Sequence, residues 1–463
     1  MLTSTDQPHK SLMLVYGGLL AVAAACFFAV IAFGEKTFLP HAVALSAARP
    51  AAASHATLHL LGALVALLLT SALLGAICRR IHQPPVIGEI LAGICLGPSL
   101  LGRFAPAVQH ALLPPDVAPQ LGTLSQIGVV LFMFLVGLEL DTSIIRSHSH
   151  STLSISHASI IVPFVLGTVA AIWLYPTFGT PTASFTVFTL FLGVSLSVTA
   201  FPVLARILTD NSLNQSPMGV VALTCAAVDD VTAWCLLALV VGVAKASAWD
   251  AAVTCASSLA YIAVLFWFVR PAISRWVRAQ GEHTRFARTA ITGVLLALLV
   301  SSLITEHIGI HAIFGAFLLG AIIPHDSWVA RAMKSRFHDL VVVLFMPAFY
   351  ALVGMRTQLA LLDGGSQWLT CGVIILLACT GKFGGSYFAA RIAGLQKRDA
   401  ASIGILMNTR GLMELVVLQV GFDLGIISPT LFAMMVVMAL VTTFLTSPLL
   451  RLTRGVPARG AAS

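Results

Sequence analysis

The chain has 463 residues, of which 58% are hydrophobic and only 10% are charged. This composition excludes the surface of an ordinary water-soluble protein and indicates that much of the chain faces a lipid bilayer. The formal net charge is +8. Because the basic residues lie mostly in short segments between apolar runs, we interpret this charge as a signal of membrane topology, and it gives no support for nucleic-acid binding.

Apolar runs long enough to cross a bilayer recur along the whole chain. A spanning helix needs roughly 20 apolar residues, and these runs predict an all-α polytopic membrane protein. The fourteen predicted spans are residues 12–33, 57–77, 85–101, 121–140, 154–174, 184–208, 218–243, 251–269, 287–305, 308–325, 339–355, 368–391, 399–421 and 430–450. For the first run a cleaved signal peptide is the competing interpretation, because Lys10 precedes it and small residues follow it.

The basic residues predict the orientation of the spans, because Lys and Arg are retained on the cytoplasmic side of short loops. With the N-terminus inside, most of the 26 basic residues fall on the inner side. The predicted inside group is Lys10, Arg79, Arg80, Arg146, Arg206, the cluster from Arg270 to Arg288, Arg331, Lys334, Arg336, Arg391, Lys397, Arg398 and the arginines after the last span. The predicted outside group is Lys36, Arg49, Arg103, Lys245 and Arg356. We therefore expect an inner (plasma) membrane protein with both termini in the cytoplasm.

The two halves of the chain resemble each other. The run Val-Val-Leu-Phe-Met-Phe-Leu-Val-Gly at 129–137 is matched by Val-Val-Leu-Phe-Met-Pro at 342–347 and Leu-Val-Gly at 352–354. A glycine-rich segment that ends in proline precedes each run, at 91–98 and at 314–324. This pattern predicts inverted six-helix repeats at about 57–245 and 287–450, which are typical of secondary transporters. Chance similarity between apolar helices is the alternative.

Two adjacent carboxylates, Asp229 and Asp230, lie near the middle of the span 218–243. A charge at the bilayer centre costs about 2.5 to 3.5 kcal/mol on insertion scales, so such residues indicate function. Consecutive residues on a helix point about 100° apart. We therefore expect one carboxylate to face a water-filled cavity and the other a neighbouring helix. Two solvated loop aspartates would require the span to break at this point.

Lys382 lies mid-span in 368–391 and is the natural counter-charge for one of these aspartates. The alternative is that its long side chain extends to the membrane interface.

Two spans are predicted to be broken at corresponding places in the two halves. The span 184–208 contains Thr199, whose hydroxyl can supply an oxygen, and Pro202, which lacks a backbone donor. The span 399–421 contains Arg410 and Glu414 within the stretch 407–414, which is polar and interrupted by a glycine at its centre. Their i, i+4 spacing is equally compatible with a simple local ion pair, and Glu89 is a further possible partner. Discontinuous helices at the midplane offer carbonyls and helix dipoles to an ion.

Four of these segments together resemble one family. The segments Gly88 to Pro98, Phe132 to Asp141, Ser197 to Arg206 and Asn408 to Leu415 are similar to the monovalent cation:proton antiporter-2 family. The resemblance covers nearly the whole chain from about residue 57 onward. It is nearest to the plant and fungal cation/proton exchangers and their bacterial relatives.

The resemblance implies a sodium/proton antiporter-like fold with discontinuous crossing helices, built from a dimerisation domain and an ion-binding core. We therefore expect three parts: an extra N-terminal span and outside loop at 1–56, a thirteen-helix antiporter domain at 57–450, and a short cytoplasmic tail at 451–463. The resemblance also implies a homodimer. It predicts a transporter, not an enzyme, with no cofactor.

The resemblance also implies that Asp230 is the ion and proton carrier and that Asp229 occupies the variable position before it. Many plant-like relatives have asparagine there. In the wider superfamily, paired aspartates with a lysine on a neighbouring helix resemble electrogenic exchangers, and an Asn-Asp pair resembles electroneutral ones. The cation, K⁺ or Na⁺, therefore stays open.

These residues predict exchange of a monovalent cation for protons by alternating access. Asp229, Asp230, Thr199 and unwound carbonyls provide the oxygen ligands that a hard cation prefers. A proton on Asp230 excludes the cation, and Asp229 binds Lys382 when the ion is absent. A cation channel and an intramembrane aspartyl protease are the alternatives, although a protease would need its two aspartates on separate helices.

Several histidines are a further candidate group. They are predicted to be scattered interfacial residues, with a pH sensor or a metal site as the alternative. These residues are His148, His150, His157, His307 and His311.

Overall fold

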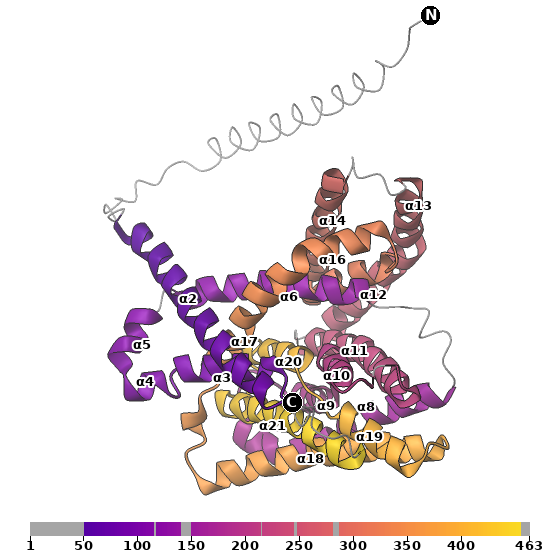
Figure 1. The fold of residues 1–463 in the computed structure, drawn as a ribbon. Helices are drawn as coiled ribbons and strands as arrows, with labels where there is room; N and C mark the ends of the chain where they lie inside the picture. Colours follow the sequence, from indigo (N-terminus) through magenta and orange to yellow (C-terminus); the bar gives the residue numbers. More distant parts are fainter. Residues whose placement is uncertain are drawn as a thin grey trace, which may run out of the picture. The chain divides into compact units, whose positions relative to one another are not determined.

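The computed structural model describes residues 51–114, 117–139, 150–213, 215–244, 248–280 and 287–454. The chain divides into two compact units, 1–55 and 56–463, and everything that follows concerns the second. The predicted span 12–33, Asp141 and most of the predicted tail lie outside the described residues. The described part is almost entirely helical (Figure 1).

In chain order the elements are α2 (Ala51–Arg80), α3 (Pro85–Leu96), α4 (Leu101–Phe104), α5 (Pro106–Leu112), α6 (Val117–Glu139), α8 (His150–Phe178), α9 (Phe185–Ser197), α10 (Phe201–Asp210), α11 (Pro217–Ala244), α12 (Ala248–Val264), η1 (Leu265–Val269), α13 (Arg270–Gln280), α14 (Ala287–Ile308), α15 (Ala312–Ile322), α16 (Trp328–Leu340), η3 (Val341–Phe345), α17 (Met346–Arg356), η4 (Leu359–Leu361), α18 (Gly365–Ile392), α19 (Lys397–Met407), α20 (Leu412–Asp423) and α21 (Pro429–Arg454).

Each predicted span from residue 57 onward coincides with helix in the structure. In the described residues, 12 helical stretches are long and apolar enough to cross a membrane. The predicted span 308–325 is the exception in length, because its helix α15 has only 11 residues. The prediction of a polytopic all-α membrane protein is confirmed.

Both spans that were predicted to be discontinuous are interrupted. Helix α9 ends at Ser197 and α10 begins at Phe201. Pro202 lies in the first turn of α10, where its missing N–H breaks no helical hydrogen bond. In the other half α19 ends at Met407 and α20 begins at Leu412. The two interruptions therefore fall at the polar positions that the sequence marked.

Four glycines show how the two halves pack against each other. A Cβ atom at Gly93 of α3 would lie 2.0 Å from a backbone carbonyl oxygen of α17, and one at Gly354 of α17 would lie 2.2 Å from a carbonyl oxygen of α3. The same reciprocal contact joins Gly137 of α6 and Gly320 of α15, at 2.3 Å in both directions. The pair α3 with α17 is thus equivalent to the pair α15 with α6, as an inverted repeat requires.

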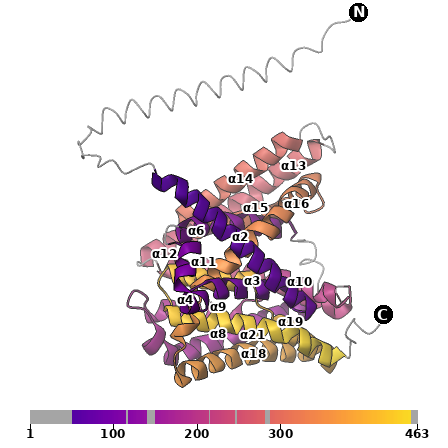
Figure 2. The same ribbon diagram turned by 60° about the vertical axis from the view of Figure 1, so that its left-hand side comes forward.

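Contacts between helices separate two groups within this unit. The first, which we call the core, contains α8, α9, α10, α11, α18, α19, α20 and α21, which pack mainly on one another. The second, the scaffold, contains α3, α6, α14, α15, α16 and α17, together with α2, whose Gly75 lies against Gly88 of α3. Figure 2 shows α8, α18 and α21 of the core side by side.

Candidate functional site

The adjacent carboxylates lie inside α11, not in a loop. Asp229 and Asp230 are near the middle of this 28-residue apolar helix, and only 1% and 3% of their surfaces are exposed. An intramembrane aspartyl protease would need its aspartates on separate helices, so their common helix argues against that alternative. The two side chains have different surroundings, as the angle between consecutive helical residues requires.

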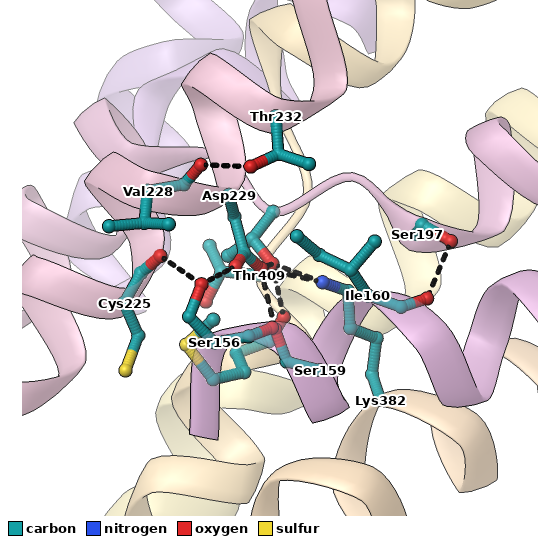
Figure 3. Close-up of polar contacts among 12 residues, drawn as sticks. Ser156, Ser159, Ile160, Ser197, Cys225, Val228, Asp229, Thr232, Lys382 and Thr409 are labelled. Carbon is teal, nitrogen blue, oxygen red and sulfur yellow. Dashed lines mark hydrogen bonds and ion pairs between the residues drawn. The ribbon is translucent and has the colours of Figure 1, made fainter. Parts of the chain in front are cut away.

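Asp229 is surrounded by donors. Its Oδ1 accepts a hydrogen bond of 2.7 Å from Ser156 Oγ. Its Oδ2 accepts from Ser159 Oγ at 2.7 Å, from Thr199 Oγ1 at 2.9 Å and from Lys382 Nζ at 3.0 Å. Figure 3 shows the two serines of α8 and Lys382 of α18 converging on this carboxylate. Two carboxylate oxygens offer about four acceptor positions, so the Asp229 carboxylate is fully hydrogen-bonded.

The ion pair between Lys382 and Asp229 is completely buried, with 0% of either side chain exposed. Lys382 also donates a hydrogen bond of 2.5 Å to Thr199 Oγ1. Thr199 lies in the extended segment between α9 and α10, and its hydroxyl is 3.1 Å from the carbonyl oxygen of Met407 at the end of α19. The pair therefore joins three parts of the core: α11, α18 and the crossing of the broken spans.

Asp230 has a different environment from its neighbour. Among the residues that the structure describes, no donor bonds to its buried Oδ1. The backbone of Phe201, the first residue of α10, interacts with this carboxylate. The N-terminus of a helix carries unsatisfied N–H groups and a positive dipole end, which favour a carboxylate. One carboxylate oxygen of Asp230 thus has no hydrogen-bond donor in the described structure.

The two interruptions cross and touch. The backbone N–H of Ala200 donates a hydrogen bond of 3.0 Å to the carbonyl oxygen of Thr409. Gly411 makes this approach possible, because a Cβ atom there would lie 2.5 Å from the side chain of Val203. Backbone oxygens that would bond within a continuous helix are therefore gathered at the crossing, next to the carboxylates.

Arg410 and Glu414 form the local ion pair that their spacing allows, with Nη1 and Oε2 2.6 Å apart and both side chains 0% exposed. The Arg410 guanidinium also donates hydrogen bonds to the carbonyl oxygens of Ser195, at 2.7 Å, and Leu196, at 2.6 Å. The last carbonyls of a helix lack partners within it, so Arg410 caps the C-terminal end of α9 and ties the two broken spans together.

Glu89 does not join this group. It lies partly buried on α3 of the scaffold, and it makes no hydrogen bond or ion pair with any residue in the described ranges. The charged group that interacts with it is Arg79 on α2. The suggestion that Glu89 partners Arg410 or Glu414 is therefore not met, because those two residues bind each other.

Sequence reasoning missed Ser156 and Ser159. Both are fully buried on α8 and both donate to Asp229. Their signal was present, since two serines at i, i+3 spacing lie on one face of the predicted span 154–174. Serine is common in transmembrane helices, so this spacing alone does not identify a site.

The charged and histidine residues near the membrane interfaces show no metal site. Within the described ranges, no group of three His, Cys, Asp or Glu side chains could hold a metal ion. Glu306 instead accepts a hydrogen bond of 2.8 Å from the backbone of Ala312 at the start of α15. Glu139 forms an exposed ion pair with Lys334. His148 lies outside the described residues.

A helical membrane protein with two broken spans that cross beside a buried carboxylate pair has the architecture of a secondary transporter. Residues 64–452 match the model of the family described as sodium/hydrogen exchanger, transmembrane. The chain belongs to this family, and the predicted resemblance and the predicted class, a transporter rather than an enzyme, are confirmed.

Individual relatives agree with this assignment. The chain is 41% identical to the Na⁺/H⁺ antiporter NhaS4 of Synechocystis sp., over 81% of this chain and 92% of that protein. It is 38% identical to cation/H⁺ antiporter 18 of Arabidopsis thaliana, over 83% of this chain. It is 34% identical to K⁺/H⁺ antiporter 1 of Saccharomyces cerevisiae, over 81% of this chain. The chain spans 48% and 45% of the length of these plant and yeast relatives.

A solved structure shows the same fold. The sodium proton antiporter MjNhaP1 from Methanocaldococcus jannaschii aligns with a TM-score of 0.63 at 14% sequence identity, covering 86% of this chain and 97% of that one. At this identity the likeness concerns the fold alone. It confirms the sodium/proton antiporter-like fold expected from the sequence.

Proposed function

We propose that this protein exchanges a monovalent cation, K⁺ or Na⁺, for protons across the membrane by alternating access, with Asp230 as the carboxylate for which ion and proton compete. One observation carries the proposal. Two adjacent buried carboxylates differ in their partners: Asp229 has four donors, whereas the Oδ1 of Asp230 has none in the described structure.

Competition at Asp230 follows from its position. A buried carboxylate without a partner is costly, and either a proton or a cation removes that cost. A hard cation prefers several oxygen ligands. Asp230 and Asp229, the Thr199 hydroxyl and carbonyls at the interrupted helices supply them. Because each occupant neutralises the same charge, binding of one excludes the other.

Lys382 is the internal counter-charge that responds to loading. In the empty carrier Lys382 is bound to Asp229, so the protein itself neutralises the Asp229 carboxylate. A cation at Asp230 lies next to the ammonium group and repels it. Asp229 then releases Lys382 and turns toward the cation. The lysine thus replaces the ion in the empty carrier and avoids an uncompensated buried charge.

Transport requires the loaded site to face each side of the membrane in turn. All the proposed ligands belong to the core, whose helices pack mainly on one another. The scaffold is held by the close backbone contacts at Gly93, Gly137, Gly320 and Gly354. Rigid-body movement of the core along the scaffold therefore moves the site relative to the membrane without disrupting the packing inside the core or inside the scaffold.

The choice of cation, the membrane and the assembly state complete the proposal. One relative is named as a Na⁺/H⁺ antiporter and another as a K⁺/H⁺ antiporter, so both ions are candidate substrates. We place the protein in the inner membrane, with both termini cytoplasmic, on the distribution of basic residues. A homodimer is the assembly that the family resemblance predicts.

The decisive test is Asp230→Asn in everted membrane vesicles. We expect the substitution to abolish cation-induced dequenching of a pH dye, with Na⁺ and K⁺ tested side by side. In the unchanged protein, the half-saturating cation concentration should rise as the pH falls, and the flux should saturate at carrier rates rather than channel rates. Asp399→Asn is the matched control, because Asp399 is a partly exposed carboxylate of the same core that pairs with Arg454. Undiminished proton movement in Asp230→Asn, at equal protein level, contradicts the proposal.

A further inference from the structure

A cavity of about 370 Å³ opens between the scaffold and the core. This volume lies within the usual range for small-molecule sites. None of the proposed ion ligands lines it. Its lining residues are Arg79, His82, Gln83, Pro84, Pro85, Arg206, Ile207, Asp210, Asn211, Ser447 and Arg451.

The cavity is positively charged. Three guanidinium groups and one carboxylate line it, and the carboxylate of Asp210 is already bound to Arg206 at 3.0 Å. Arg79 and Arg451 make no ion pair or hydrogen bond with any residue of the described ranges. Arg79 has only its longer-range interaction with the partly buried Glu89, so the guanidinium groups of Arg79 and Arg451 can both donate hydrogen bonds to an anion. This charge repels a transported cation and suits an anion.

The three arginines come from both groups of helices. Arg79 lies in the last turn of α2 in the scaffold, whereas Arg206 is on α10 and Arg451 is on α21, both in the core. A single anion bound to Arg79 and to Arg206 or Arg451 would thus connect the scaffold to the core. Movement of the core past the scaffold would separate Arg79 from the two arginines of the core.

We propose that this arginine-lined cavity, which we call the arginine cavity, binds a phosphate group and that the bound phosphate holds the core against the scaffold. Guanidinium groups bind phosphate through paired, charge-assisted hydrogen bonds. The phosphate belongs either to an anionic lipid headgroup or to a soluble phosphate compound. Its effect on exchange rests on the proposed function, but its binding does not.

Binding is measured first, on the purified full-length chain in neutral detergent, by the shift of the melting temperature. Pyrophosphate and short-chain phosphatidylglycerol are titrated separately. We expect saturable stabilisation by at least one of them. Arg79→Gln and Arg451→Gln should each weaken it about tenfold, the loss expected for one hydrogen bond to a charged group. Because the two variants lie on different helices, misfolding of one leaves the other informative.

Arg80→Gln is the matched control. Arg80 is the next residue of the same helix end and is exposed, but it does not line the cavity. It removes the same charge from the same side of the protein, so a general surface-charge effect would weaken binding equally in Arg79→Gln and Arg80→Gln. Equal loss in these two variants, or no saturable binding of either probe, overturns the proposal.

Exchange is then measured in vesicles of phosphatidylcholine, with phosphatidylglycerol in the bilayer or pyrophosphate in the lumen and outside. The ligand that binds should slow exchange severalfold in the unchanged protein and not in Arg79→Gln. A response to pyrophosphate identifies a soluble ligand, and a response to the lipid alone identifies a headgroup. If the protein binds a probe but transports no cation under any condition, the proposed function fails while the binding site stands. If it binds and transports without slowing, the holding role is wrong.

Discussion

Two buried ion pairs lie at the crossing of the broken spans, and they differ in what else they bind. Lys382 and Asp229 come from different helices, and their other partners are the side chains of Ser156, Ser159 and Thr199. Arg410 and Glu414 are four residues apart on one span.

The partners of Arg410 are mainly backbone groups. Its guanidinium donates to the carbonyl oxygens of Ser195 and Leu196. A cation or proton cannot take the place of this guanidinium without leaving the end of α9 uncapped. Lys382 and Asp229 instead have hydroxyl partners that can reorient. The comparison teaches that complete burial does not distinguish a structural ion pair from an exchangeable one, whereas the type of the remaining partners does.

Arg410→Ala should have the largest effect on stability. It leaves Glu414 buried without its partner, which costs about 3 to 5 kcal/mol, and it also uncaps α9. We expect little folded protein in the membrane and a strongly lowered melting temperature in detergent. A melting temperature close to that of the unchanged chain would refute the structural role of Arg410.

A double-mutant cycle should separate the two pairs further. Lys382→Met and Asp229→Asn should each destabilise by about 3 to 5 kcal/mol. The double variant should recover most of that loss, because both charges are removed together. Arg410→Met with Glu414→Leu should not recover, because the carbonyls of α9 stay unpaired. Melting temperatures of the single and double variants measure both cycles, and equal recovery in the two pairs would remove the distinction.

Ser156→Ala and Ser159→Ala should have intermediate effects. Each removes one hydrogen bond to a buried carboxylate, which is worth about 1.5 to 3 kcal/mol. Asp229 then loses part of its stabilisation in the empty carrier, so the half-saturating cation concentration should change by about tenfold. Thr168→Ala is the control on the same helix, because the exposed Thr168 hydroxyl donates only to the backbone carbonyl of Val165 within α8. An unchanged value in both serine variants would show that these donors do not act on the ion site.

Arg356→Ala should have the smallest effect. Arg356 of the scaffold binds Asp423 of the core at 2.8 Å, and this pair is 35% and 48% exposed. Exposed pairs contribute about 1 kcal/mol or less, so stability should hardly change and the exchange rate should change by about fivefold at most. Lys334→Ala, which breaks an exposed pair within the scaffold, should leave the rate unaltered. Equal rate changes in both variants would show that a bond between core and scaffold has no special role.

The spans and their interruptions were predictable because they depend on local chemistry. A run of apolar residues must lie in the bilayer whatever its neighbours are, and Pro202 after a polar run favours the first turn of a new helix. The repeat was visible in the Leu-Val-Gly runs that end at Gly137 and Gly354. Their equivalence became clear only from the reciprocal contacts of Gly137 with α15 and of Gly354 with α3.

Other features depend on how helices rotate and tilt against each other. The sequence offered Glu89 as a partner for Arg410, but α3 belongs to the scaffold and Arg410 binds Glu414 within the core. The serines that surround Asp229 were unremarkable residues in an apolar span. Their role depends on the face that α8 turns toward α11.

The amino-acid sequence by itself determined that the chain crosses a membrane, the positions and order of the apolar helices from residue 57 onward, their two interruptions and the residues with charge to neutralise. These follow from hydrophobicity and from the cost of charge in a bilayer, which act on each segment separately. Tertiary structure alone decided that Asp229 takes all four donors and Asp230 keeps an open oxygen. That difference between adjacent residues arises because their side chains point to different neighbouring helices, and only the packing of α11 specifies which neighbours those are.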